Sequence, residues 1–156
     1  RMEIAIGPYE ASQHNAVVSL WHRCGLVRPA NDPATDILMK TAWQPNLLLV
    51  AVARGRVVGT AMVGYEGHRG WINYLAVDPD VQRQGVGRQI LGHAEDRLAD
   101  LGCVKVQLMV RTENRRVVGF YEALGYVEEP VVAMGKRLSV APRPSIIEPA
   151  LRDHAR

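Results

Sequence analysis

Residues 82–87, with the sequence QRQGVG, are the stretch of this chain that decides its fold and the kind of ligand it takes. They lie between the apolar run Trp71–Val77, typical of a strand buried on both faces, and residues 87–101, whose apolar positions recur on one helical face. Glycines let neighbouring backbone N–H groups turn toward one point, and the first N–H groups of a helix have no intrahelical partner. The sequence therefore predicts an anion-binding loop, suited to phosphate.

A second apolar run, Val104–Val110, follows this helix after a glycine. Strand, helix and strand in so short a span form a βαβ unit, so we expect the Trp71–Val77 and Val104–Val110 strands to be parallel and joined by a right-handed crossover. The loop at 82–87 then lies at the carboxyl end of the first strand, where α/β proteins tend to bind their ligands.

The rest of the chain predicts a mixed α/β (α+β) architecture with about six to seven strands and about four helices. Further strands are expected at Glu3–Ile6, Leu47–Ala53, Val57–Glu66, Tyr126–Glu128 and Val131–Arg137. Further helices are expected at Ser12–Cys24, at residues 33–42 after the Asp32 cap, and after the Asn114 cap up to Gly125. Residues 139–156 hold three of the nine prolines and predict an extended tail.

Composition limits the classes of protein to consider. The chain has 156 residues, of which 47% are hydrophobic, enough for one domain with a core of its own. Cys24 and Cys103 lie far apart without a nearby histidine at ligand spacing, so we expect neither a disulfide framework nor a metal site, and a cytoplasmic location. No apolar run is long enough to span a bilayer, and a net charge of +3 is too small to indicate nucleic-acid binding.

Two common phosphate-binding motifs do not fit the loop. A Walker A loop needs lysine and then serine or threonine after its last glycine, but Arg88 and Gln89 stand there. A dinucleotide fingerprint needs a third small residue, but that place holds Ile90, and no acidic residue lies near position 107 to bind a ribose. A nucleotide-binding oxidoreductase is therefore a poor hypothesis.

The chain resembles the GNAT superfamily of acyl-CoA-dependent N-acyltransferases. Gln82-x-x-Gly85-x-Gly87 matches the pyrophosphate loop of that family, and Asn114 followed seven residues later by Tyr121 matches its later helix. Residues 28–33 (RPANDP) and 64–70 (GYEGHRG) are also similar to the small bacterial YpeA-like branch. The resemblance covers about residues 2–138, expected to form one N-acetyltransferase domain, and leaves 139–156 unmatched.

This resemblance implies the GNAT fold, in which two splayed parallel strands of a mixed sheet hold the acyl-CoA. It also implies acetyl-CoA as co-substrate, with no metal. The residues that would contact acetyl-CoA are Leu75, Ala76, Val77, Gln82, Arg83, Gln84, Gly85, Val86, Gly87, Arg88, Asn114 and Tyr121.

Acyl transfer to an amine needs a free amine, stabilisation of an oxyanion and a proton for the departing thiolate. The resemblance assigns the last role to Tyr121, and a backbone N–H on the Leu75–Val77 strand is expected to meet the oxyanion. Some relatives carry a glutamate where Met109 stands here, so the candidate bases are Glu66 and His68, acting through water. Solvated charges in a glycine-rich turn are the structural alternative for both.

The acceptor pocket is expected beside Arg28, Asn31 and Glu66, although Asp32 and the proline after it are already explained as a helix cap. We expect an acetyl-CoA-dependent N-acetyltransferase in which a small-molecule amine, or a peptide or protein amine, attacks directly. A homodimer is compatible with this expectation. A non-catalytic acyl-CoA-binding or interaction module on the same fold is the alternative: Tyr121 favours the enzyme, whereas the missing glutamate at 109 keeps the alternative open.

Overall fold

The computed structural model describes residues 2–139, and its centre is one five-stranded sheet with the order β1-β2-β3-β4-β5. The strands are β1 (Ala5–Pro8), β2 (Leu48–Ala53), β3 (Arg56–Tyr65), β4 (Gly70–Val77) and β5 (Val106–Leu108). Neighbouring strands are antiparallel from β1 to β4, whereas β4 and β5 are parallel. The predicted parallel pair is therefore confirmed.

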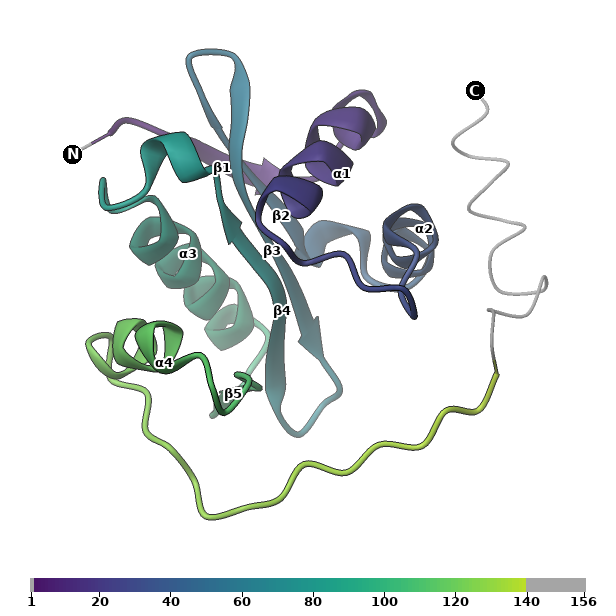
Figure 1. The fold of residues 1–156 in the computed structure, drawn as a ribbon, viewed down its shortest axis with the longest axis vertical. Coiled ribbons are helices and arrows are strands. Elements are labelled where there is room, and N and C mark those ends of the chain that lie inside the picture. Colours follow the sequence, from purple (N-terminus) through teal and green to yellow (C-terminus); the bar gives the residue numbers. More distant parts are fainter. Residues whose placement is uncertain (1, 140–156) are drawn as a thin grey trace.

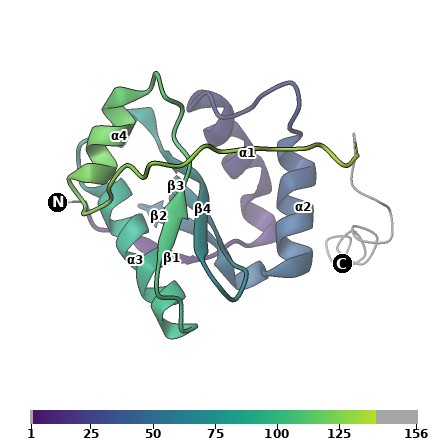
Figure 2. The same cartoon turned by 90° about the horizontal axis from the view of Figure 1, so that it is seen from below.

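Two helices cover each face of the sheet (Figure 1). On one face lie α1 (His14–Arg23) and α2 (Pro33–Trp43), and on the other lie α3 (Val86–Asp100) and α4 (Arg115–Glu122), as the view from below also shows (Figure 2). Short 3-10 turns occupy Ala11–Gln13, Pro45–Leu47 and Pro79–Val81. The layers are those of the expected α/β class.

The core lies on both sides of the sheet because side chains alternate along each strand. In β2, Leu48 and Val50 join the buried cluster beneath α1 and α2, whereas Leu49 and Ala51 join the cluster beneath α3. All four side chains are at most 2% exposed, so this part of β2 is buried on both faces. Its near-continuous apolar sequence follows from burial on both faces.

The local start and stop signals act as expected. Asp32 and Asn114 each accept a hydrogen bond from the backbone N–H three residues on, which caps α2 and α4. Between β2 and β3, Arg54 and Gly55 have φ of 51° and 74°, the left-handed pair of a type I′ hairpin turn. These contacts fix the direction in which the chain enters each element.

The expected strand count is wrong: five strands form among the described residues rather than six to seven. The strands expected at Tyr126–Glu128 and Val131–Arg137 do not form there, and neither segment pairs with another strand. Their large apolar side chains are mostly exposed, with Val132 at 87%. Strand propensity by itself does not supply a pairing partner. The predicted tail, except Ser139, lies outside the described residues.

Cys24 and Cys103 are free thiols, each part-buried. Within residues 2–139, no three histidine, cysteine or acidic side chains are grouped closely enough to hold a metal ion. No helix in that range is both long and apolar enough to cross a bilayer.

Candidate functional site

A β-bulge in the middle of β4 opens one edge of the sheet. Tyr74 and Leu75 both lie opposite Ala61 of β3, and Tyr74 takes a left-handed φ of 49°. Pairing between β4 and β5 ends just before the bulge, at Ile72 and Leu108. Beyond this point the outer backbone groups of β4 have no strand partner among the described residues. The predicted splay of the two parallel strands follows from this bend.

A chain of buried polar contacts holds the bulge from the α1 and α2 side. The Trp21 indole donates a hydrogen bond to Thr60 Oγ1 at 2.8 Å, and the Thr60 hydroxyl donates to the carbonyl oxygen of Tyr74 at 2.8 Å. The Tyr74 hydroxyl in turn donates to Asp36 Oδ2 at 2.5 Å. The Tyr74 ring stacks on the Trp21 ring, with ring centroids 3.7 Å apart. Four elements are thus tied together at the opening edge, by residues that the sequence analysis did not single out.

The predicted anion loop begins where β4 ends. Asp78, 2% exposed, accepts the N–H of Asp80 at 3.0 Å and pairs with Arg23 of α1 at 3.0 Å, which anchors the start of the loop. Farther along, Arg83 and Gly85 have φ of 65° and 79°, both left-handed. Left-handed residues turn backbone N–H groups toward a shared concavity, which is how protein loops bind anions.

Helix α3 starts immediately after the loop, with Gly85 as an N-cap that lacks a side-chain cap. The N–H groups of its first turn therefore have no intrahelical acceptor and carry the positive end of the helix dipole. Gly87 is tightly surrounded, since a Cβ there would lie 3.3 Å from Phe120 Cζ and 3.4 Å from Val77 Cγ2. Because Gly87 has no side chain, α4 and the end of β4 can pack closely against the start of α3.

Tyr121 lies in α4 next to this junction and is 8% exposed. Its ring packs edge-on against the rings of Phe120 and Tyr126, with ring centroids 5.2 Å and 5.5 Å apart. Burial raises the pKa of Tyr121 to about 12, so its hydroxyl stays protonated at neutral pH. Within residues 2–139 this hydroxyl has no hydrogen-bond partner. Every fully buried side-chain nitrogen or oxygen in that range does have a hydrogen-bond partner, so the Tyr121 hydroxyl is not fully buried. The Tyr121 Oη is therefore accessible from outside the core and available to a ligand.

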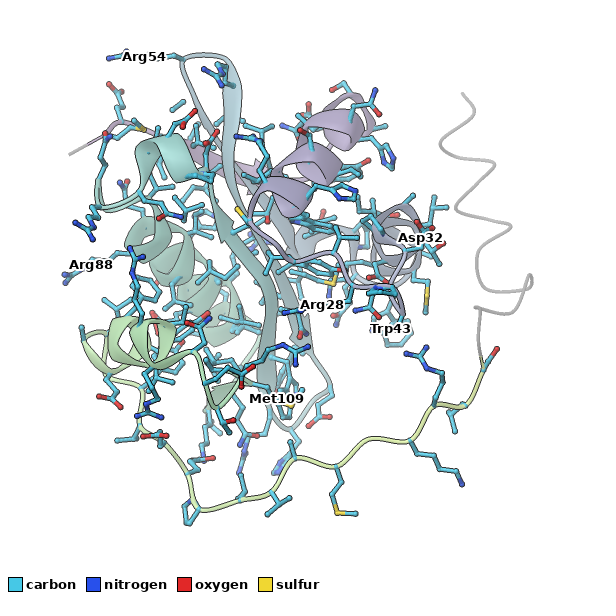
Figure 3. All side chains as sticks on the ribbon, in the orientation of Figure 1. Arg28, Asp32, Trp43, Arg54, Arg88 and Met109 are labelled. Atoms are coloured by element: carbon cyan, nitrogen blue, oxygen red, sulfur yellow. The ribbon has the colours of Figure 1, made fainter. Side chains whose placement is uncertain are left out.

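The remaining predicted contacts surround the loop. Asn114 is exposed; its side-chain oxygen caps α4, and its NH2 group makes no hydrogen bond within the described residues. Exposed Arg83 and Arg88 line two shallow grooves, one of about 830 Å³ at the ends of β1 and β2 and one of about 620 Å³ along α3. Figure 3 shows Arg88 near the start of α3. The fold thus gathers the loop, the end of β4 and the α4 residues at one corner.

Known proteins share this arrangement. The sequence model of the acetyltransferase (GNAT) family matches residues 15–126. The chain belongs to the GNAT family. An acetyltransferase of Pectobacterium atrosepticum is 44% identical over 137 residues, which is 88% of this chain and 96% of the relative.

Two solved structures have the same fold as this GNAT chain. The ribosomal-protein-S18-alanine N-acetyltransferase of Escherichia coli superposes with a TM-score of 0.69 at 26% identity, over 81% of this chain and 79% of that one. The PaiA N-acetyltransferase of Thermoplasma acidophilum, solved with coenzyme A, superposes with a TM-score of 0.72 at 15% identity. The match covers 84% of this chain and 94% of that one. With the family match, these findings confirm the predicted fold and enzyme class: an acetyl-CoA-dependent N-acetyltransferase.

The two predicted bases of this acetyltransferase lie away from the loop. Glu66 and His68 are exposed on the turn between β3 and β4, where the Glu66 N–H donates to the carbonyl oxygen of Arg69 at 3.4 Å. All eight residues of β4 separate this turn from the loop corner. The structure thus places Tyr121 in α4, which packs near the loop end of β4, and places Glu66 and His68 at the opposite end of β4.

Arg28 and Asn31 lie in the exposed connection between α1 and α2, where the Asn31 N–H closes a turn on the Arg28 carbonyl at 3.0 Å. A hydrogen bond with its own backbone lowers the pKa of Glu113, and the charges of Arg111 and Arg28 lower it further. Arg28 on the α1–α2 connection is thus near enough to Glu113 on the β5–α4 connection to act on its pKa. In Figure 3, Arg28 is drawn in front of β4, with Met109 below it.

Lys40 is a second feature of α2 in this GNAT enzyme that the sequence analysis missed. It lies one turn beyond Asp36, and burial lowers its pKa to about 8. Its Nζ donates to Gln44 Oε1 at 3.0 Å, and the Gln44 side chain donates to the carbonyl oxygen of Tyr65 at 2.9 Å. Burial also raises the pKa of Asp36, opposed by the Tyr74 hydrogen bond. No local motif marks these residues, because each depends on what packs above it.

Proposed function

We propose that this enzyme transfers the acetyl group of acetyl-CoA to a primary amine by direct attack, with Tyr121 protonating the coenzyme A thiolate. The amine nitrogen forms a bond to the carbonyl carbon, the C–S bond breaks, and the Tyr121 hydroxyl gives its proton to the sulfur. The amine loses a proton in exchange. The observation that carries this proposal is the Tyr121 hydroxyl, which is protonated and has no hydrogen-bond partner among the described residues. Its neighbour in α4, Phe120, lies against Gly87 at the start of α3.

In this proposal acetyl-CoA lies along the open edge of β4, with its pyrophosphate at the loop. The N–H groups of the first turn of α3 would bind the phosphates, and Arg83 and Arg88 would add positive charge. Backbone groups of Leu75–Val77 would run beside the pantetheine and offer an N–H to the oxyanion. The NH2 group of the exposed Asn114 would supply a further hydrogen bond. Residues 2–138 would thereby form one N-acetyltransferase domain.

The proton of the attacking amine would leave through water toward Glu66 or His68, the two candidate bases. Both side chains are exposed and lie at the start of β4, so a water chain is required. The pH profile of kcat/KM in Glu66→Gln and His68→Ala tests this role. A shifted acidic limb of the profile in either variant supports this role as base. If both variants keep the wild-type pH profile, the base is another group.

The acceptor is a small-molecule amine, or a peptide or protein amine, bound beside Arg28 and Asn31. A protein acceptor is named for one structural neighbour, the ribosomal-protein-S18-alanine enzyme, at 26% identity. A peptide N-terminus, a lysine side chain and a small amine all present the same nucleophile. The acceptor panel must therefore contain all three.

Release of free thiol from acetyl-CoA, measured against that panel, tests the proposed function. We expect amine-dependent release that exceeds acetyl-CoA hydrolysis without acceptor. Thermal stabilisation by acetyl-CoA with no thiol release from any acceptor would instead favour a non-catalytic acyl-CoA-binding module. Absence of both stabilisation and thiol release would overturn the site itself.

A further inference from the structure

The buried carboxylate of Asp78 stands where β4 ends and the chain enters the predicted anion loop. Asp78 is 2% exposed, and its Oδ1 accepts the N–H of Asp80 at 3.0 Å. Among residues 2–139 its one ion pair is with Arg23, whose guanidinium nitrogen lies 3.0 Å from the same oxygen. A buried carboxylate is costly unless a cation and hydrogen bonds compensate it. The entry to the loop is therefore held by a side chain of α1, which is not part of the loop.

The ion pair between Arg23 and Asp78 is present at neutral pH. Burial raises the pKa of Asp78, but hydrogen bonds from the Asp80 N–H and from Arg23 lower it. The charges of Arg23 and Arg56 lower it further, so the pKa lies below its ordinary value and Asp78 is ionised. Of the two arginines, Arg56 acts on Asp78 by its charge, whereas Arg23 also makes a direct contact.

A second contact joins the same end of α1 to the same end of β4. The Cys24 thiol, at the C-cap of α1, donates to the carbonyl oxygen of Val77 at 3.3 Å. Val77 is the last residue of β4, and Asp78 follows it. Two consecutive residues at the end of α1 thus contact two consecutive residues at the entry to the loop. Because α1 and α3 lie on opposite faces of the sheet, α1 supports the loop from the face opposite to α3 (Figure 1).

The middle of the loop depends on its two fixed ends. Residues 82–85 are exposed, whereas Val86 at the start of α3 is 1% exposed and fixed in the core. The end of the loop is thus held by α3 and its entry by Asp78. A left-handed non-glycine residue such as Arg83 is unfavourable and persists only where the surrounding structure determines it. The affinity of a site built from such backbone depends on the fraction of molecules that hold the binding shape.

We propose that Arg23 is a positioning residue for acetyl-CoA, which holds the loop through Asp78 in the shape that binds the pyrophosphate. The inference rests on the proposed acetyl-CoA site at this loop. Arg23 acts through Asp78, so its loss should lower the fraction of loops in the binding shape and raise the Kd for acetyl-CoA. The kcat at saturating acetyl-CoA should not change, because Tyr121 in α4 takes no part in these contacts.

Calorimetric binding of acetyl-CoA to the full chain tests this role. In Arg23→Gln we expect the Kd to rise about three- to tenfold, the range suited to a part-exposed ion pair. Arg23→Lys can still pair with Asp78 and should recover most of the affinity. Arg56→Gln is the matched control, because it removes the same charge near Asp78 without removing a contact. Its Kd should stay within about twofold of the wild type.

Asp78→Asn separates positioning from charge. The asparagine oxygen can still accept the Asp80 N–H, but the charge that holds Arg23 is gone. Positioning predicts a weaker affinity for acetyl-CoA. A purely electrostatic effect predicts a tighter one, because a negative charge near the phosphates has been removed. The double variant Arg23→Gln/Asp78→Asn should bind acetyl-CoA about as Arg23→Gln does, as expected of two residues that act as one unit.

The outcomes distinguish this proposal from the proposed function. A wild-type Kd in Arg23→Gln, an equal rise in Arg56→Gln, or tighter binding in Asp78→Asn would overturn the role of Arg23 and leave the acetyl-CoA site in place. A wild-type chain that does not bind acetyl-CoA would overturn both. Each Kd is measured well below the Tm of the variant, so that a loss of affinity cannot come from unfolding. If Asp78→Asn does not fold, the Arg23 variants and Arg56→Gln still decide the result.

Discussion

Two regions along the open β4 edge, the loop end and the bulge, are built in different ways. At the loop end, the proposed anion-binding surface consists of backbone: left-handed Arg83 and Gly85, and the uncapped first turn of α3. On the α2 side, the bulge is held by side chains, among them Tyr74 and Asp36, from elements far apart in the sequence. A backbone surface needs glycines at fixed spacing and so leaves a local sequence motif. A side-chain network leaves none.

Tyr121→Phe is the change expected to have the largest effect, on the loop side. Loss of the proton donor should lower kcat about 100-fold or more, within the range known for general acid catalysis. The ring contacts with Phe120 and Tyr126 remain, so the Kd for acetyl-CoA should stay within about twofold. Steady-state kinetics and calorimetric binding measure the two effects. Tyr65→Phe is the matched control, and a wild-type kcat in Tyr121→Phe would remove the tyrosine from the mechanism.

Gly85→Ala tests whether backbone shape makes the loop. A Cβ at Gly85 meets no atom within 4 Å, so only its φ of 79° opposes the change. Left-handed backbone costs a non-glycine residue about 1 to 2 kcal/mol, so the free loop of the variant should relax out of it. Restoring the left-handed conformation on binding should raise the acetyl-CoA Kd about five- to thirtyfold. Gly92→Ala in α3 also meets no atom but needs no special φ, so its Kd should not change. Equal Kd values for both variants would argue against a backbone-built site.

Tyr74→Phe addresses the α2 side alone. It removes the hydrogen bond to Asp36 but keeps the stacking on Trp21. A hydrogen bond to a charged group contributes about 1.5 to 3 kcal/mol, so the free energy of unfolding should fall by about that much. The acetyl-CoA Kd should stay the same. Urea unfolding and calorimetric binding separate these outcomes, and a large loss of acetyl-CoA affinity would show that the two sides are coupled.

Lys40→Met should produce the smallest effect, seen in the pH dependence of stability. The Lys40 pKa is about 8 in the folded chain against 10.5 as its ordinary value. Between these values the unfolded chain binds more protons, so the wild type gains stability as pH rises through this window. In urea unfolding from pH 7 to 10, the free energy of unfolding of the wild type should rise relative to that of Lys40→Met. A pH-independent difference between the two would contradict the assigned burial of Lys40.

The sequence predicted those parts of the fold that depend on neighbouring residues. The caps at Asp32 and Asn114 and the parallel pairing around α3 have local causes and are confirmed. The bulge at Tyr74 could not be predicted, because neither Tyr74 nor its neighbours carry a glycine or another bulge signal. The strand at Val131–Arg137 was predicted wrongly, since strand propensity does not supply a partner edge.

Of the candidate site, the sequence located the loop and, by resemblance, Tyr121. Asp36 and Lys40 stayed hidden because an acidic or basic residue on a helix is usually solvated, and only the packing of α2 on the sheet makes them half-buried. Glu66 and His68 stay predictions as bases. Their place on the β3–β4 turn makes the pH profile of their variants the decisive result for that role.

Amide hydrogen exchange of the full chain, with and without acetyl-CoA, tests most directly where the acyl-CoA binds. Bound ligand should slow exchange at residues 75–77 on the open β4 edge and at residues 85–88 at the start of α3, because their N–H groups would gain acceptors. Exchange at the turn 66–69 should not change. Slowed exchange at residues 2–5 and 52–55, which line the groove at the ends of β1 and β2, with none at 75–77 or 85–88, would contradict the account.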